Sequence, residues 1–484
     1  MKWFKFIQKV NTYVLVLLSN LVFSQAPDTT WTSNYHRGSY DMAYSIQQTS
    51  DNGFILAGES HLINTNYTDI MLVKTNAMGD SQWAKVYTDS LGLYAYSIQE
   101  DPTRNFVIAG KRYTSWGVEN AYFLKTDENG DSLWSFTFGG DRNTYAVQVV
   151  CTPDSSYMFT GWQNRPSTYN DIFVYKMNAN GGSGWYKYYN RGSDERANCI
   201  AATSDKGYII GGFTDFHTAG MRDYYIIKID SVGDTLWTKT YGSGWHDQCY
   251  AVQQTTDGGY ILYGDSDSSS TTRALAIKTD PLGNVEWQKA YYRGTWYDKG
   301  RSVQQTSDGG FIFGGDSHNF GQGNDFGFFR TDAYGDTLWT KMVDNGGTEF
   351  AHSVLQSHDG GYILAGGTSY IGPHGGDFWV VKLNAFPTTI EEKKNISSTI
   401  QLMQNYPNPF NPATTIEFNL PKSTKVTLKI FNILGEEVET LLSAFLHSGL
   451  HSYTWDARNY ASSIYYYKIQ AGDFCEVKKM ILMK

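Results

Sequence analysis

Short runs of alternating apolar and polar residues follow one another along most of the chain, and Asp-Gly, Asn-Gly and similar dipeptides separate them. Alternation with a period of two is typical of half-buried β-strands, and glycine in these dipeptides accepts the positive φ of a tight hairpin. One unit reads YSIQQTSDNGFILAGES, then a variable stretch, then DIMLVKTNAMGDSQWAKVYT, which is enough for four strands. The pattern therefore predicts an all-β protein built from repeated four-stranded units.

The unit recurs seven times between residues 28 and 384. A tryptophan marks the fourth strand, and successive tryptophans lie 50 to 52 residues apart: Trp31, Trp83, Trp134, Trp185, Trp237, Trp287 and Trp339. The third strand ends in a basic residue in every unit, from Lys74 to Lys382. Four antiparallel strands in roughly 50 residues are typical of one blade of a β-propeller. We interpret the tryptophans as packing between blades and the basic residues as structural.

The first and last units are complementary halves. No tryptophan follows Lys382 at the usual spacing, and the first three strands of a unit do not precede Trp31. A strand around Trp31 that pairs with residues 377–383 would complete the seventh blade and close a ring, which removes exposed strand edges. The sequence therefore predicts a seven-bladed β-propeller with four-stranded blades and an N-terminal strand clasp, over residues 25–384.

The repeats, with segments such as DIFVYKMNANGGSGW and DGGYILAGG, resemble the SBBP-type β-propeller repeats of secreted bacterial proteins. The resemblance covers residues 28–384. It implies the architecture of this part of the chain and implies nothing about activity.

The composition changes after Asn384. Residues 385–402 form a polar, charged linker, and residues 403–484 alternate again, as in a small Ig-like β-sandwich of about seven short strands. The segment YPNPFNPATTIEFNLP gives this part a resemblance to the type A C-terminal sorting domain of the type IX secretion system. The resemblance implies that the type IX secretion machinery recognises residues 403–484 and exports the chain across the outer membrane.

The first residues of the chain resemble a secretory signal. Lys2, Lys5 and Lys9 precede an apolar stretch, residues 13–23, that is too short to span a bilayer. We interpret residues 1–24 as a signal peptide and expect no transmembrane segment, so the protein enters the periplasm and then reaches the outer-membrane surface or the extracellular space. Export permits disulfides, and the sequence leaves open whether Cys199 and Cys249, on consecutive repeats, are bonded.

Charge and motifs narrow the function. A net charge of −9 and a pI of about 5.6 exclude a general nucleic-acid binder, which needs a basic surface. No GxSxG, HExxH or P-loop motif occurs, nor a GxGxxG in a βαβ context. We therefore expect a protein that is not an enzyme and that needs no cofactor, apart from the cation considered next.

An acidic residue begins the first strand in five of the seven units: Asp41, Glu195, Asp247, Asp298 and Glu349. In the other two units we place Leu93 and Arg142 at this position. Ring closure would gather the carboxylates around one mouth of the channel, where a cation such as calcium would offset their repulsion. The alternative interpretation is that each carboxylate caps its own turn.

Aromatic residues outside the tryptophan ladder fall in the long, variable connections. These connections leave the blades on one face, and they carry Trp116, Trp162, Trp245, Trp296, His246 and Tyr297. Exposed aromatics on loops held by a rigid scaffold are typical of a binding face for glycans or proteins. The alternative interpretation is that the rings only cover the ends of the blades.

The first hypothesis for function is therefore a secreted, non-enzymatic propeller that binds a glycan or a protein. The alternative is an extracellular polysaccharide hydrolase or lyase that draws two carboxyls from the acidic ring. A third hypothesis is a purely structural adhesion module.

Overall fold

The computed structural model describes residues 26–62, 67–115, 117–166, 169–216, 221–268, 271–291, 298–319, 323–369, 375–385, 400–403, 405, 408–420, 424–446, 449–472 and 474–483. The chain divides into two compact units, residues 1–386 and 387–484. The regular elements within the described residues are all strands, and none of these residues form a helix that is long and apolar enough to cross a membrane. The expected signal peptide, residues 1–24, lies outside the described residues.

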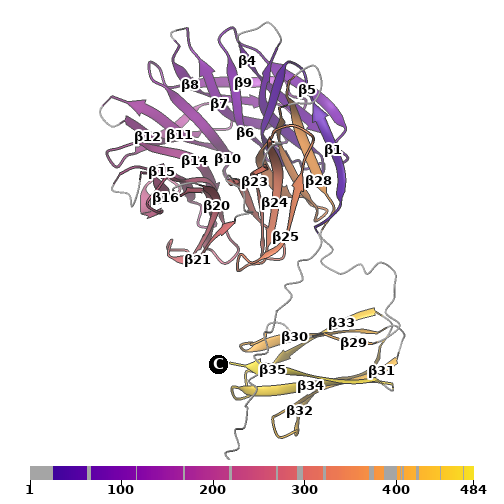
Figure 1. Ribbon diagram of the computed structural model, residues 1–484. Coiled ribbons are helices and arrows are strands. Elements are labelled where there is room, and N and C mark those ends of the chain that lie inside the picture. The colour runs from indigo at the N-terminus through magenta and orange to yellow at the C-terminus, as the bar shows by residue number, and fades with distance from the viewer. Residues whose placement is uncertain are drawn as a thin grey trace, which may run out of the picture. The chain divides into compact units, whose positions relative to one another are not determined.

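The first unit contains seven four-stranded antiparallel sheets (Figure 1). The first three sheets are β2 (Tyr40–Gln48), β3 (Phe54–His61), β4 (Thr68–Thr75) and β5 (Ser81–Tyr87); β6 (Leu93–Glu100), β7 (Phe106–Tyr113), β8 (Glu119–Thr126) and β9 (Ser132–Phe138); and β10 (Thr144–Cys151), β11 (Tyr157–Arg165), β12 (Tyr169–Met177) and β13 (Ser183–Tyr189). The next three are β14 (Glu195–Ala202), β15 (Tyr208–Thr214), β16 (Asp223–Ile229) and β17 (Thr235–Tyr241); β18 (Asp247–Gln254), β19 (Tyr260–Asp267), β20 (Thr272–Thr279) and β21 (Val285–Tyr291); and β22 (Asp298–Gln305), β23 (Phe311–Asn319), β24 (Gly323–Thr331) and β25 (Thr337–Val343). The seventh sheet is β26 (Glu349–Gln356), β27 (Tyr362–Thr368), β28 (Asp377–Leu383) and β1 (Thr29–Tyr35).

The seventh sheet joins the two ends of the repeat array. β1 pairs antiparallel with β28, and Trp31 lies opposite Lys382, so the pairing predicted from the two half-units is confirmed. The ring of Trp31 also packs against Gly79 of the first sheet, as Trp83 packs against Gly130 of the second. These turn glycines have positive φ, and a Cβ there would meet the indole ring, so glycine is required. The ladder tryptophans therefore pack between sheets.

Glutamine side chains on the first strands accept hydrogen bonds from backbone N–H groups of the neighbouring sheet. Gln47 Oε1 accepts a hydrogen bond from the backbone N–H of Glu100 at 2.6 Å, and Gln304 Oε1 accepts one from Gln356 at 2.6 Å. Between the first and seventh sheets, Gln48 Oε1 accepts a hydrogen bond from the N–H of His358 at 2.7 Å. The first strands contact one another in sequence from β2 to β26, and β26 contacts β2. The arrangement is consistent with a propeller.

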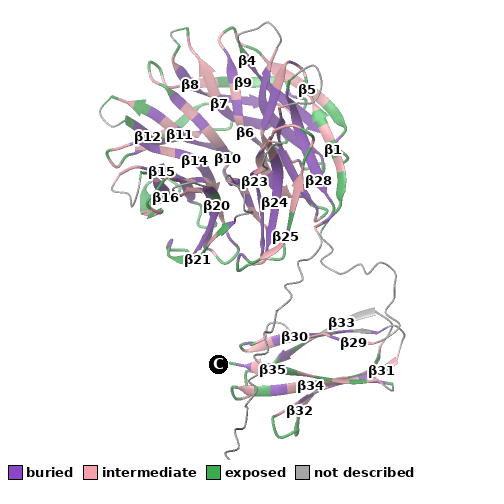
Figure 2. Ribbon diagram, viewed as in Figure 1, coloured by how far each residue is buried: buried purple, intermediate pink, exposed green. Residues whose placement is uncertain are grey.

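Burial follows from the position of each strand in its sheet (Figure 2). The second and third strands lie between neighbouring sheets and are buried along their length, as in β27 and β28, whereas the fourth strand, such as β5, has exposed positions. Each apolar cluster joins two adjacent sheets; one contains Ile55 and Leu72 of the first sheet with Ile98 of the second. The core of this unit therefore lies between the sheets.

An ion pair closes the hairpin turn of every sheet in the first unit. The basic residue at the end of the third strand pairs with an aspartate in the turn between the first two strands: Lys74–Asp51, Lys125–Asp101, Lys176–Asp154, Lys228–Asp205, Lys278–Asp257, Arg330–Asp308 and Lys382–Asp359. The structural interpretation of the repeated basic residues is confirmed.

The second unit consists of a three-stranded and a four-stranded sheet that share one apolar core around Trp455 and Tyr467. Its strands are β29 (Gln401–Leu402), β30 (Ala413–Leu420), β31 (Thr424–Phe431), β32 (Glu437–Leu446), β33 (Gly449–Asp456), β34 (Ser463–Ala471) and β35 (Phe474–Leu482). Two antiparallel sheets around one core are what the sequence predicts for this part of the chain.

Candidate functional site

Each first strand of the seven sheets contains a β-bulge at the same position. The pairing with the second strand skips one residue, for example between Ala43 and Ser45 and between Gly300 and Ser302. A bulge leaves one residue unpaired and redirects its side chain. The seven bulge residues are Tyr44, Tyr96, Val147, Asn198, Tyr250, Arg301 and His352.

All seven bulge residues line one cavity of about 430 Å³, so the cavity lies where the first strands meet. Serine side chains that follow four of the bulges also line it: Ser45, Ser97, Ser302 and Ser353. The strands around the cavity repeat closely, whereas the bulge residue is tyrosine in three sheets and valine, asparagine, arginine or histidine in the other four. This is the pattern of a uniform scaffold that carries a specific set of side chains.

The register corrects our alignment of the third repeat. Sequence comparison matches Val147 with Ile46, but Val149 is the residue that occupies the position of Ile46, because Val147 is the bulge. The residue equivalent to Asp41 in the third sheet is Thr144 and not Arg142. The shift is two residues, which keeps the alternation of a strand, and the run TYAVQVV offers apolar residues in both alignments, so the sequence pattern alone does not reveal it.

Charged groups around Arg301 form one side of the cavity wall. Arg301 Nε lies 3.9 Å from Asp316 Oδ2, and its guanidinium lies over the ring of Tyr250 at 4.7 Å. Burial raises the pKa of Asp316 to about 6 and that of Asp265 to about 7, and Arg301 partly offsets both increases. Burial, together with Arg301, lowers the pKa of His352 to about 3, so this imidazole is neutral at pH 7.

Asp265 and Asp316 also hold the bulged strands in place. Asp265 Oδ1 accepts a hydrogen bond from the N–H of Gly300 at 2.8 Å, and Asp316 Oδ1 accepts one from Ala351 at 2.5 Å. Each bond joins the second strand of one sheet to the first strand of the next, directly before the bulge residue. The two buried carboxyls therefore position Arg301 and His352.

Aromatic rings continue the cavity wall beside His352. The ring of Tyr44 lies 5.4 Å from that of Tyr96 and 4.8 Å from that of His352. The hydroxyl of Tyr44 donates a hydrogen bond to Glu59 Oε1 at 3.0 Å. Burial raises the pKa of Glu59, although this hydrogen bond lowers it in part.

Cationic side chains and aromatic rings alternate in a row that runs from the second sheet to the fourth, which we call the ladder. Lys111 Nζ lies 4.4 Å from the ring of Tyr94 and 5.0 Å from that of Tyr145, which stacks on Trp162 at 4.0 Å. The guanidinium of Arg196 covers Trp162 at 4.4 Å. Cation–π contacts of this kind hold a polar, aromatic surface rigid.

The loop-face residues predicted from the sequence have different positions. Trp162 is a strand residue of β11, not a loop residue, and its ring is sandwiched in the ladder. Trp245 is 46% exposed in the connection to β18, and His246 is partly buried beside it, with a backbone bridge to Arg222. Trp116, Trp296 and Tyr297 lie outside the described residues.

The five acidic residues are all buried, and each contacts its own loop or sheet. Asp41 accepts a hydrogen bond from the N–H of Arg37 at 2.7 Å, Glu195 from Arg191 at 3.1 Å, and Asp247 from Ser243 at 2.6 Å. Asp298 accepts one from the hydroxyl of Ser317, and Glu349 accepts one from the N–H of Gly347 at 3.2 Å. The turn-capping interpretation accounts for the contacts of Asp41, Glu195, Asp247 and Glu349, whereas Asp298 bonds across its own sheet to β23.

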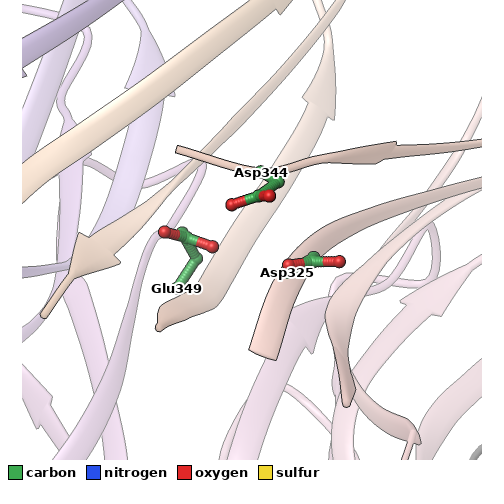
Figure 3. Close-up of side chains that lie close together, drawn as sticks. All are labelled: Asp325, Asp344 and Glu349. Atoms are coloured by element: carbon green, nitrogen blue, oxygen red, sulfur yellow. The ribbon is translucent and has the colours of Figure 1, made fainter. Parts of the chain in front are cut away.

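Carboxylates do converge at one place outside the expected ring (Figure 3). Among the described residues, Asp325, Asp344 and Glu349 form the one group of three acidic, histidine or cysteine side chains with ligand atoms within 4.8 Å of one another. Of the five expected acidic residues this group includes Glu349 alone. Burial, with the negative charges of Asp344 and Asp325, raises the pKa of Glu349 to about 7.

The cysteines in the described residues are free thiols. Cys199 and Cys249 are buried in one apolar cluster between the fourth and fifth sheets. Burial raises the pKa of the Cys199 thiol well above its ordinary value, so this thiol is neutral in the folded chain.

The comparisons with known proteins identify the C-terminal part of the chain. Residues 404–483 match the family model described as the secretion system C-terminal sorting domain. This part of the chain is therefore a type IX secretion sorting domain, which indicates secretion to the cell surface or the extracellular space. No curated protein matches the chain.

Solved structures similar to the chain include propeller-like proteins at low identity. PorZ, a surface component of the type IX secretion system of Porphyromonas gingivalis, has 11% identity and a TM-score of 0.40, with coverage of 91% of this chain. This chain spans 59% of the PorZ chain. A protein of unknown function from Dyadobacter fermentans has 10% identity and a TM-score of 0.45, with coverage of 74% of this chain and 99% of its own. The β-propeller domain of a trilobed protease from Pyrococcus furiosus has 9% identity and a TM-score of 0.39, with coverage of 68% and 90%. These likenesses bear on neither the ligand nor the activity.

Proposed function

We propose that this chain is a secreted, non-enzymatic binding protein whose first unit is a closed seven-bladed propeller of SBBP type with an N-terminal strand clasp. The pairing of β1 with β28 supports the clasp, and the contacts of Trp31 with Gly79 and of Gln48 with His358 support closure. The N-terminal signal takes the chain to the periplasm, and the sorting domain takes it to the cell surface.

The ligand of this propeller is an extracellular glycan that binds in the cavity lined by the bulge residues. The observation that carries this proposal is the variation of the seven bulge residues on an otherwise repeated scaffold. Three tyrosines offer ring faces for stacking on a sugar, and Arg301 offers a charged fork that matches a carboxylate. Asn198 and the serines add hydrogen-bonding groups, so a sugar that bears a carboxylate fits this set of side chains.

A binding screen tests this proposal. The full chain is titrated with a panel of neutral and uronic-acid oligosaccharides, and with extracellular proteins in a separate arm. We expect the uronic-acid oligosaccharides to bind, and we expect Tyr250→Ala and Arg301→Met to weaken binding at least tenfold with little change in Tm. Tyr334→Ala is the matched control, because Tyr334 is 66% exposed in a hairpin turn and does not line the cavity.

The loop surface is tested in the same screen. Trp245→Ala removes the exposed tryptophan of the loop face without altering the cavity. If this variant loses binding while Tyr250→Ala and Arg301→Met bind normally, the ligand occupies the loops and our location is wrong. Binding of proteins alone would reject the glycan.

The enzymatic alternative, a polysaccharide hydrolase or lyase, is favoured by one observation. Asp265 and Asp316 are buried carboxyls with raised pKa values beside the cavity, as a general acid requires. Their hydrogen bonds to Gly300 and Ala351 favour a structural role instead. Release of reducing or unsaturated ends from the same oligosaccharides, abolished by Asp265→Asn or Asp316→Asn, would establish the enzyme.

A further inference from the structure

The group of Asp325, Asp344 and Glu349 lies at the junction between the sixth and seventh sheets. Asp325 belongs to β24, Asp344 directly follows β25, and Glu349 begins β26. Asp325 and Glu349 are buried, whereas Asp344 is exposed. The group is therefore closed on the protein side and open to solvent on the side of Asp344.

Asp344 and Glu349 have few partners for their negative charge. Gly346 donates its N–H to Asp344 Oδ1 at 2.6 Å, and Gly347 donates its N–H to Glu349 Oε1 at 3.2 Å. Glu349 is 0% exposed, and its second oxygen, Oε2, is buried without a hydrogen-bond partner. Neither Asp344 nor Glu349 forms an ion pair with any residue that the structure describes. A buried carboxylate oxygen that faces other carboxylates needs a positively charged partner.

The equivalent junction between the third and fourth sheets shows how the same positions are satisfied without an ion. Asp171, Asn190 and Glu195 occupy the positions of Asp325, Asp344 and Glu349. There Asn190 Nδ2 donates a hydrogen bond to Asp171 Oδ1 at 2.5 Å, and the hydroxyl of Thr214 donates one to Glu195 Oε1 at 2.9 Å. Asp344 replaces this asparagine, and a carboxylate cannot donate in its place. Asp171 also pairs with Arg165 at 3.6 Å, and Asn319 occupies the position of this arginine in the sixth sheet. Two differences thus turn a satisfied junction into one with three acidic groups.

The spacing of the oxygens fits calcium. Two oxygens that bind one calcium ion at ~2.4 Å are at most ~4.8 Å apart, and calcium accepts carboxylate oxygens in a flexible geometry, whereas magnesium requires a near-ideal octahedron. The ligand atoms of the three carboxylates lie within 4.8 Å of one another. We propose that Asp325, Asp344 and Glu349 bind one calcium ion, with water completing its coordination on the open side.

The ion would fasten the sixth sheet to the seventh, since its ligands come from both. The same connection leads through β26 to His352, a bulge residue of the cavity. The site itself does not depend on the identity of the glycan or on whether one binds.

Calorimetric titration of the chelator-treated full chain with calcium chloride, in the absence of any glycan, tests the proposal. We expect one site with a Kd on the order of 10⁻⁴–10⁻³ M, as in extracellular calcium modules, and weaker binding of magnesium. Asp344→Asn introduces the residue that Asn190 provides at the junction between the third and fourth sheets. Because Asp344 is exposed, we expect this variant to fold and to lose calcium affinity at least tenfold.

Two further variants make the test specific. Glu349→Gln should lose calcium binding as Asp344→Asn does, and Glu195→Gln, the matched control at the junction without the ion, should bind calcium as the unaltered chain does. Calcium should raise the Tm of the unaltered chain and of Glu195→Gln by a few degrees and leave that of Asp344→Asn unchanged. The proposal is wrong if the unaltered chain shows no binding at 10 times the expected Kd, if Asp344→Asn retains full affinity, or if Glu195→Gln loses it equally.

Discussion

We call the end of each sheet with the hairpin turn between its first two strands the turn end, and the other end, with the bulge residues of the cavity, the loop end. At the turn end a basic side chain pairs with an aspartate in all seven sheets. At the loop end the bulge residues that line the cavity are not all of one kind. In each of the seven sheets, the aspartate of the turn end closes the hairpin and neutralises the basic side chain. The loop end has one cavity to which the seven sheets contribute five kinds of side chain at the bulges: three tyrosines, a valine, an asparagine, an arginine and a histidine. Repetition therefore marks stability in this protein, and its loss marks the surface that is free to acquire a ligand.

The electrostatics differ in the same way. At the turn end, burial alone would raise the pKa of Asp205, but the hydrogen bonds from Lys228 and Thr203 lower it to about 2. At the loop end, burial raises the pKa of Asp265 to about 7 with only partial compensation. One end is thus stabilised by its charged carboxylates, and the other keeps carboxyls that would be more stable protonated.

The largest effect is expected from deleting β1, residues 29–35, because this strand joins the two ends of the repeat array in the seventh sheet. The deletion exposes the edge of β28 and removes the contact of Trp31 with Gly79. We expect the first unit to lose its cooperative thermal transition in calorimetry. A chain that ends at residue 386 is the control and should keep this transition, since the two units are separately compact. A normal transition in the chain without β1 would show that the seventh sheet does not need it.

A substitution at the turn end should cost stability where one at the loop end does not. Asp205→Ala leaves Lys228, only 3% exposed, without its carboxylate and removes the acceptor of the N–H of Gly207. We expect a loss of about 2 kcal/mol in the free energy of unfolding, below the usual cost of breaking a buried pair because Asp205 itself is half exposed.

Trp245→Ala is the comparison at the loop end. Trp245 is 46% exposed, so its removal should change the unfolding free energy by about 0.5 kcal/mol or less. Urea unfolding followed by tryptophan fluorescence measures both variants. Equal losses in the two would mean that the ends do not divide stability from binding.

The free energy of unfolding should depend on pH in two ranges: below pH ~4 through carboxylates of the turn end, and between pH 7 and ~4 through buried carboxyls of the loop end. Asp51 and Asp205, with pKa values of about 2, contribute stability that is complete above pH ~4 and is lost as the pH falls through 2. Asp265, Asp316 and Glu349, with pKa values of about 7, 6 and 7, bind protons more tightly in the folded state, so they add stability as the pH falls from 7 to ~4. His352, with a pKa of about 3, offsets part of this gain, because the folded chain keeps it neutral where the unfolded chain would protonate it.

The Tm should therefore be highest between pH ~4 and ~6. The double variant Asp265→Asn and Asp316→Asn should reduce the rise in Tm between pH 7 and 4, where Glu349 and His352 still titrate, and leave the loss of stability below pH ~4 unchanged. A Tm profile that is flat from pH 7 to 4 in the unaltered chain would contradict the assignment of raised pKa values to the loop end. Calorimetric scans in a set of buffers matched for ionic strength measure the profile.

The sequence predicts the turn end well because each of its features is local and repeated. The spacing between Lys228 and Asp205 recurs in other units, and the pairing of Trp31 with β28 follows from counting half-units. The bulges are not predicted, since the register of β10 depends on pairing and a run such as TYAVQVV fits two alignments. The group around Asp344 is also missed, because it joins three strands and becomes apparent only beside Asn190.

The smallest effect is expected at a second carboxylate of the turn end. Lys278 Nζ lies 2.8 Å from Asp257 and also 2.8 Å from Glu286, which is about half exposed. The position of Glu286 is Gln82 in the first sheet, where the amide oxygen accepts a hydrogen bond from Lys74 at 3.1 Å, and Leu236 in the fourth. The aspartate that pairs with the basic residue is therefore present in every sheet, whereas the residue at the position of Glu286 varies.

Glu286→Gln and Glu286→Leu should therefore each change the unfolding free energy by about 0.5 kcal/mol or less, as is usual for exposed pairs. Asp257→Ala in the same sheet should cost several times more, because the aspartate also caps the turn through Thr255 and Gly259. Urea unfolding at low and high salt measures all three, and salt should erase the small contribution of Glu286 first. A loss above 1 kcal/mol in Glu286→Gln would mean that the buried cation depends on both carboxylates. The fifth sheet would then depart from the repeat at its turn end as well, and repetition alone would no longer separate the two ends.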